Sequence, residues 1–131
     1  MKKIVLDTNA YTRLLIGEED VLDIIGTADT IYMSIFVLGE LYAGFAQGTK
    51  VRENRDILHR FLLKPPVKIL NATAETAEVF GEMKSNLKKT DSPIPVNDVW
   101  IAAHAIETGA VLMTYDVDFK KIPGLRLWDN A

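Results

Sequence analysis

The hydrophobic positions of the chain fall into two kinds of segment. Short runs that are mostly apolar occupy residues 4–6, 31–33, 67–70 and 111–113, and residues 125–127 are a candidate for a fifth. Runs of this length are typical of strands buried inside a parallel sheet. The sequence therefore predicts four or five short strands spread along the whole chain.

Longer segments with apolar residues at helical spacing separate these runs. The predicted helices cover residues 11–15, 35–47, 52–63, 73–89 and 98–108. Thr8 or Asn9 is expected to cap the first of them and Ser34 the second. Strands that alternate with helices predict an α/β fold, with a parallel sheet covered by helices on both faces. No linker or repeat divides the chain, so we expect a single domain over residues 1–131.

Composition narrows the class of protein. Hydrophobic residues make up 48% of the 131 residues, which is enough for a packed core. The chain has no cysteine, so disulfides, thiolate metal sites and cysteine nucleophiles are excluded. Its net charge of −3 is unusual for a protein that binds nucleic acid. If a polyanion is the partner, bound cations or local basic patches must reverse the field.

Nothing in the sequence predicts a membrane protein. Asp7 interrupts the first apolar run too early for a signal peptide. No apolar stretch is long enough to span a bilayer. We expect a cytoplasmic protein.

Three aspartates are placed so that they can meet. Asp7 directly follows the first strand, and Asp116 comes shortly after the fourth. The carboxyl ends of parallel strands form the usual ligand crevice of an open α/β sheet. Asp98 opens a predicted helix whose beginning should face the same edge. We expect these carboxylates to converge.

Glu40 lies in the middle of a predicted helix with Val37, Leu41 and Gly44 around it. We expect it to be embedded in apolar surroundings. A carboxylate in such a place needs a cation, an arginine or a proton. Converging carboxylates without matching bases favour divalent cations, and oxygen ligands suit Mg²⁺ or Mn²⁺. The two histidines, His59 and His104, lack helical metal-ligand partners, so we expect them at the surface or at an edge.

Taken singly, each acid also has a simpler interpretation. Asp98 can be a helix cap, with Asn97 competing for that role. Asp7 can cap the first helix or belong to a turn, and Asp116 and Asp118 can be ordinary loop residues. The joint placement of these acids is what favours a metal site.

Four segments of the sequence resemble the motifs of one family. Residues 4–9 resemble the opening motif of PIN-domain nucleases, and residues 34–44 look like the second motif. Residues 94–103 and 114–119 are similar to the third and fourth. Their order, spacing and structural context agree over nearly the whole chain. This resemblance implies a PIN-like three-layer sandwich with a central parallel sheet.

Within that family, a short single domain looks like the VapC-type toxins of toxin–antitoxin pairs. The resemblance implies an endoribonuclease dependent on Mg²⁺ or Mn²⁺, which hydrolyses RNA with a water activated by metal. It also implies a cytoplasmic homodimer that a small antitoxin protein holds inactive. The number of metal ions stays open.

The resemblance also assigns residues. The acids carried over as catalytic residues and metal ligands are Asp7, Glu40, Asp98 and Asp116. Thr114 would support them through its hydroxyl, and Asn9 is a second candidate for that role. The motif departs from the family pattern at Asp118, an extra acid that leaves the fourth ligand open, and in residues 90–93, which lack a frequent glycine.

Other functions remain as alternatives. A receiver domain of a signalling relay has a similar size and an acidic pocket, but it requires paired acids after the first strand and an aspartate after the third. Asp7 stands alone, and residues 67–70 are not followed by an aspartate. A PIN-like module that binds RNA or protein without cutting is a second alternative, although it would lack some of the four acids. The sequence does not distinguish RNA from DNA, since no residue in it identifies a 2′-hydroxyl reader.

Overall fold

A central sheet of four parallel strands organises the protein. The computed structural model describes residues 2–128, and its strands are β1 (Lys3–Leu6), β2 (Thr30–Ser34), β3 (Val67–Leu70) and β4 (Val111–Met113). Their order in the sheet is β3-β2-β1-β4, and every pairing is parallel. The predicted α/β class and parallel sheet are confirmed. All four strands end at one edge, which brings the residues that follow them together.

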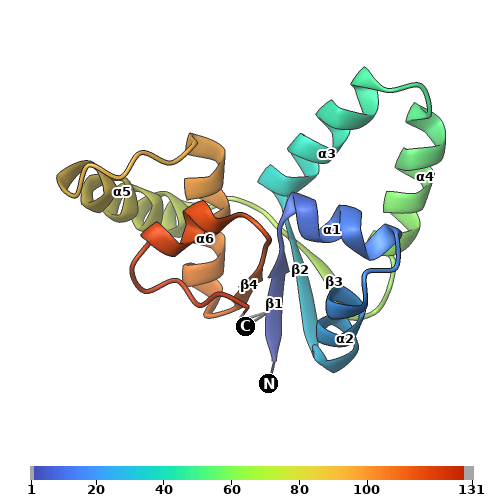
Figure 1. Ribbon diagram of the computed structural model, residues 1–131, viewed down its shortest axis with the longest axis horizontal. Helices are drawn as coiled ribbons and strands as arrows, with labels where there is room; N and C mark the ends of the chain where they lie inside the picture. The colour runs from blue at the N-terminus through green and yellow to red at the C-terminus, as the bar shows by residue number, and fades with distance from the viewer. Residues whose placement is uncertain (1, 129–131) are drawn as a thin grey trace.

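Helices cover both sides of this sheet (Figure 1). They are α1 (Thr8–Leu15), α2 (Glu19–Thr27), α3 (Ile35–Gln47), α4 (Val51–Leu62), α5 (Ala74–Lys89) and α6 (Val96–Thr108). In Figure 1, α5 and α6 lie to the left of the strands, and α3 and α4 form a hairpin to the right. Within residues 2–128, no helix is both long and apolar enough to cross a membrane.

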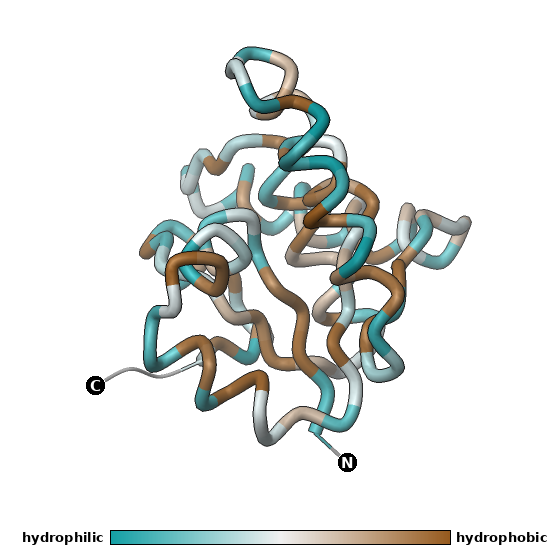
Figure 2. The backbone as a smooth tube through the Cα atoms, turned by 90° about the vertical axis from the view of Figure 1, so that its right-hand side faces the viewer, coloured by the Kyte–Doolittle hydropathy of each residue, from teal (hydrophilic) through white to brown (hydrophobic). Residues whose placement is uncertain are grey.

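The core lies along the neighbouring strands β1 and β4. Ile4, Val5 and Leu6 of β1 are completely buried, as are Leu112 and Met113 of β4. Figure 2 shows this as a hydrophobic path through the middle of the molecule, whereas hydrophilic and hydrophobic residues alternate along the helices around it. A strand covered on both faces has no polar alternation, which explains the wholly apolar run at its position in the sequence.

Most helix boundaries follow local chemistry that the sequence contains. The hydroxyl of Ser34 accepts a hydrogen bond from Phe36 N at 3.2 Å and caps α3, as predicted. Thr73 caps α5 in a reciprocal arrangement with Thr76. Gly109 ends α6 with a φ of 69°, a left-handed conformation that favours glycine.

The structure corrects the start of the first helix. Neither Thr8 nor Asn9 caps it, because both lie inside α1 and Asp7 is the capping residue. The carboxylate of Asp7 accepts a hydrogen bond from Thr8 N at 2.8 Å. Asp7 therefore follows β1 directly and caps α1.

Three elements differ from the sequence expectation. The candidate fifth strand is only a single bridge, between Leu127 and Leu112. Helix α2 was not predicted, and neither was the short 3₁₀ helix η1 (Val117–Lys121). Helix α2 is only two turns long and exposes Leu22, so its apolar pattern is too brief to stand out.

Candidate functional site

Asp7 lies at the centre of the carboxyl edge of the sheet. It follows β1, the strand that pairs with both β2 and β4, and its exposed fraction is only 5%. One carboxylate oxygen caps α1, and the other accepts a hydrogen bond from Thr114 Oγ1 at 2.7 Å. Burial raises the pKa of Asp7, these two hydrogen bonds lower it, and the charges of Glu40 and Asp116 raise it again. Asp7 is thus a buried carboxylate fixed from both sides.

Glu40 reaches the same edge from α3. Its Oε1 accepts a hydrogen bond from Thr8 Oγ1 at 2.7 Å, which joins α3 to the first turn of α1. The prediction that Glu40 is embedded in apolar surroundings is wrong, because its side chain is exposed. Val37 and Leu41 are buried, whereas Glu40 is exposed. A helix turns by about 100° per residue, so the burial of Leu41 does not extend to the residue before it.

Asp98 approaches from α6. The helix begins at Val96 after Pro95, so Asp98 lies in the first turn and the alternative that it caps the helix is wrong. Its pKa is raised to about 6, first by burial and then by the charges of nearby carboxylates, of which Asp7 contributes most. Within residues 2–128, its carboxylate has no hydrogen-bond partner. Asp98 is therefore the acid in this group that most needs a positive charge.

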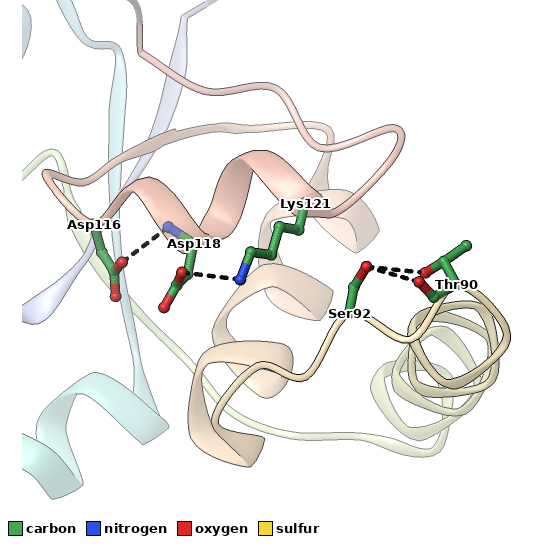
Figure 3. Close-up of polar contacts among 5 residues, drawn as sticks. All are labelled: Thr90, Ser92, Asp116, Asp118 and Lys121. Carbon is green, nitrogen blue, oxygen red and sulfur yellow. Dashed lines mark hydrogen bonds and ion pairs between the residues drawn. The ribbon is translucent and has the colours of Figure 1, made fainter.

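Asp116 and Asp118 differ in their surroundings. Asp116 Oδ1 accepts a hydrogen bond from Asp118 N at 3.0 Å and caps η1. The carboxylate of Asp118 forms an ion pair with Lys121 at 3.3 Å. Figure 3 shows both carboxylates on the same side of η1, with the side chain of Lys121 extending back toward Asp118. The charge of Asp118 thus has a local partner.

Thr114 and Asn9 join the segments that carry these acids. Thr114 Oγ1 donates to Asp7 and accepts from Asp116 N at 3.1 Å, so one hydroxyl connects two of the acids. Asn9 Oδ1 accepts a hydrogen bond from Tyr115 N at 3.1 Å. These contacts hold the segment after β4 against α1. The structure therefore brings together all seven residues that the sequence singled out.

The acids lie near one another but do not surround a single position for an ion. Among residues 2–128, no three acidic or histidine side chains are close enough to hold one ion between them as they stand. Mg²⁺ suits such an arrangement, because it usually binds one or two carboxylates and keeps several waters. The ligand set consists of oxygen atoms alone, which fits Mg²⁺ or Mn²⁺ better than zinc.

The sequence missed one part of this edge. His104 was expected at the surface or at an edge, and that prediction is wrong, because its side chain is completely buried. Its Nδ1 lies 2.8 Å from Ser34 Oγ, and its Nε2 lies 3.2 Å from the carbonyl oxygen of Asn71. The uninterrupted run of small apolar residues around it, from Ile101 to Ala105, was the available signal that this helix is buried on most sides.

Comparison with known proteins agrees with this geometry. The sequence model of the PIN domain family matches residues 4–125. Ribonuclease VapC2 of Rickettsia felis is 34% identical over 112 residues, which cover 83% of this chain and 82% of that protein. The tRNA(fMet)-specific endonuclease VapC of Salmonella typhimurium is 26% identical over 132 residues, covering 98% of each chain.

A solved structure extends the comparison to three dimensions. The VapBC2 complex of Rickettsia felis, bound to a DNA fragment from its promoter, contains a chain that matches with a TM-score of 0.83 and 30% identity. The match covers 96% of this chain and 97% of that one. The chain belongs to the PIN-domain family, and its relatives within that family are the VapC ribonucleases.

Proposed function

We propose that this protein is a metal-dependent endoribonuclease and the toxin of a toxin–antitoxin pair. The observation that carries the proposal is the meeting of Asp7, Glu40, Asp98 and Asp116 at one edge of the sheet, where mutual repulsion and burial raise the pKa of Asp98 to about 6. The charge of such a group is stabilised by divalent cations. The VapC ribonucleases supply independent support for cleavage of RNA.

Four acids hold the cations in this proposal, and neighbouring side chains orient them. Asp7 and Asp98 are the central ligands, and Glu40 and Asp116 complete the set. When bound, Mg²⁺ or Mn²⁺ lowers the pKa of water so that the nucleophile forms at neutral pH, and it stabilises the leaving oxygen. No side-chain nucleophile is required.

Three polar side chains keep these acids in place. Thr114 fixes the carboxylate of Asp7, and Thr8 fixes that of Glu40. Asn9 holds the backbone of the segment that carries Asp116, through its hydrogen bond with Tyr115 N. A fixed ligand binds a cation with less loss of side-chain freedom, so these contacts favour metal binding.

The test of the acid site is a matched pair of substitutions. Asp98→Asn keeps the size of the side chain and removes the charge, so we expect cleavage of a single-stranded RNA to fall by orders of magnitude. Asp23→Asn makes the same chemical change on the exposed side of α2 and should leave cleavage unchanged. Equal activity of the two variants would overturn the proposed site. A parallel assay with single-stranded DNA establishes whether the 2′-hydroxyl matters.

The surface also offers a place for the antitoxin. An apolar groove of about 560 Å³ lies between α1, α2 and α4. Leu14, Leu15 and Phe61 line it, and Arg60 and Lys64 stand among them. We infer that an apolar segment of a small antitoxin occupies this groove, and that acidic residues of that segment face Arg60 and Lys64. The sequence had suggested a groove beside residues 35–45, and the groove between α1, α2 and α4 is a second candidate.

An arginine of that antitoxin would then neutralise the acid site. The planar guanidinium suits carboxylates, and the unpartnered carboxylate of Asp98 is the natural acceptor. Leu15→Glu should weaken binding of the small protein encoded beside this gene, whereas Leu63→Glu, outside the groove lining but more exposed, should not. Equal binding by both variants, measured by calorimetry, would place the antitoxin elsewhere.

Assembly and location complete the proposal. We propose that the toxin acts in the cytoplasm as a homodimer. Ile35 and Val96 expose 42% and 55% of their surface at the beginnings of α3 and α6. Exposed aliphatic side chains of this kind favour a contact between copies. Light scattering of the purified chain should give twice the monomer mass, and a monomer at all concentrations would contradict this part.

A further inference from the structure

A chain of buried hydrogen bonds joins the ends of β2 and β3 through α6. Its centre is His104, which has no exposed surface. His104 Nδ1 lies 2.8 Å from Ser34 Oγ at the end of β2, and Nε2 lies 3.2 Å from the carbonyl oxygen of Asn71, just after β3. Ser34 Oγ also accepts a hydrogen bond from Phe36 N at 3.2 Å. The chain thus runs from the first turn of α3 to the segment after β3.

One placement of protons satisfies every group in this chain. The carbonyl of Asn71 can only accept, so Nε2 of His104 carries a proton. Nδ1 of a neutral imidazole then accepts from the hydroxyl of Ser34, whose oxygen accepts from Phe36 N. Burial lowers the pKa of His104, whereas the hydrogen bond with Asn71 and the charge of Glu107 raise it. The net lowering keeps the ring neutral at pH 7.

This chain connects the helices that carry two of the acids. Ser34 caps α3, and Glu40 lies six residues later on that helix. His104 belongs to α6, and Asp98 lies six residues earlier. Six residues of helix correspond to about 9 Å along the axis. A short, rigid stretch of helix therefore connects each of these two acids with the buried hydrogen bond between His104 and Ser34.

Other contacts between the same helices restrict them less. The ring of Phe36 lies 5.1 Å from the ring of Trp100 and 5.5 Å from that of His104, measured between centroids. Asn97 Nδ2 donates to the carbonyl oxygen of Phe36 at 3.4 Å, near the limit for a hydrogen bond. Apolar packing is non-directional, whereas hydrogen bonds require specific distances and angles. The hydrogen bond of His104 with Ser34 at 2.8 Å is shorter than that of Asn97, so it is the stronger directional connection between α6 and the beginning of α3.

We propose that His104 is a positioning residue, whose neutral imidazole sets the separation of Glu40 and Asp98 by fixing α3 against α6 and the end of β3. The inference rests on the proposed function, because it assigns His104 to the geometry of the cation site. His104 itself is too deeply buried to touch RNA or a cation. Its role passes through the two helices.

The test compares two substitutions of His104 that separate packing from hydrogen bonding. His104→Leu keeps an apolar group of similar size and removes both hydrogen bonds, whereas His104→Gln keeps one donor and one acceptor. His59→Leu, on the exposed side of α4, is the matched control. Each variant is titrated with Mn²⁺ by calorimetry without RNA, at a temperature where melting curves show it to be folded.

The expected results differ clearly for a positioning and a packing role. His104→Leu should weaken Mn²⁺ binding on the order of 10- to 100-fold, His104→Gln should recover most of that loss, and His59→Leu should bind as the unaltered chain does. A folded His104→Leu variant with unaltered Mn²⁺ affinity would overturn the inference. If the unaltered chain neither binds Mn²⁺ nor cleaves RNA, the proposed function fails first.

Two NMR measurements need neither metal nor activity. The nitrogen spectrum of the unaltered chain should show His104 protonated at Nε2 alone, and protonation at Nδ1 instead would overturn the inference. If His104→Leu does not fold, His104→Gln can still be measured, because glutamine keeps one donor and one acceptor. In His104→Gln the amide signals of Glu40 and Asp98 should stay near their original positions. Large shifts there, with unaltered Mn²⁺ affinity, would show that the hydrogen bonds of His104 do not control the acids.

Discussion

Thr114 donates a hydrogen bond of 2.7 Å from its hydroxyl to Asp7 Oδ2, across the gap between the ends of β4 and β1. The two residues are far apart in the sequence, and the parallel pairing of their strands brings them together. The same hydroxyl accepts from Asp116 N. This contact lowers the pKa of a carboxylate that burial raises, so it helps to keep Asp7 charged.

Removing that hydroxyl should weaken both the fold and the site. Thr114→Val leaves Asp7 buried with one hydrogen bond fewer, which should lower the free energy of unfolding by about 1–3 kcal/mol. It should also raise the Mn²⁺ concentration for half-maximal cleavage on the order of 10-fold or more. Thr114→Ser keeps the hydroxyl and is the control. Urea unfolding and metal titration of both variants check this, and equal behaviour of the two would refute the role of the hydroxyl.

Asp98→Asn should stabilise the protein when metal is absent. The repulsion and burial that raise the pKa of Asp98 to about 6 penalise its charged form in the folded state. Because the group is partly exposed, we expect a gain of roughly 1–2 kcal/mol at pH 7.5 rather than the full value of the shift. Thermal melting in EDTA measures it. A lower melting temperature than that of the unaltered chain would show that burial and repulsion do not penalise the charged form of Asp98 in the folded state.

The same shift sets the pH dependence of that gain. The folded chain holds the proton of Asp98 more tightly than the unfolded chain, whose aspartate has an ordinary pKa of about 3.9. Between about pH 4 and pH 6 the folded state therefore binds more protons, and the contribution of Asp98 to stability falls as the pH rises. The difference in melting temperature between Asp98→Asn and the unaltered chain should be largest above pH 6 and small near pH 4. A difference that is constant over this range would contradict the assignment.

Asp116 and Asp118 should contribute unequally to cleavage. Asp118 already has the ion pair with Lys121 (Figure 3), whereas the backbone N–H of Asp116 donates to the same Thr114 hydroxyl that contacts Asp7. We expect Asp116→Asn to lower the cleavage rate by orders of magnitude and Asp118→Asn to have a smaller effect. Initial rates against Mg²⁺ concentration distinguish them. If Asp118→Asn is the more damaging change, Asp118 is the fourth acid.

The sequence predicted which residues lie at the carboxyl edge of the sheet better than it predicted how buried each of them is. The position of Asp7 followed from a wholly apolar strand that ends at an acid, because strand order and direction fix where the next residue lies. The surroundings of Glu40 did not follow, since apolar neighbours along a helix do not define the face on which a residue lies. The sequence first singled out Glu40 by an expected burial that the structure does not show, and the family resemblance assigned it to the site independently.

His104 shows a second limit. Its partners, Ser34 and the carbonyl of Asn71, belong to two other elements, and one of them is a backbone atom. No pattern along α6 specifies such contacts, because they depend on how α6 packs against the ends of β2 and β3. Local capping signals, such as that of Ser34, were readable since both partners are neighbours in the sequence.

The central claim is that cleavage of RNA depends on cations held by the four acids. The most direct measurement is the initial rate at which the purified chain cleaves a single-stranded RNA with Mg²⁺, after an excess of EDTA, and after Mg²⁺ is added back. Cleavage should stop with EDTA and return with Mg²⁺. An unchanged rate in excess EDTA would contradict the claim.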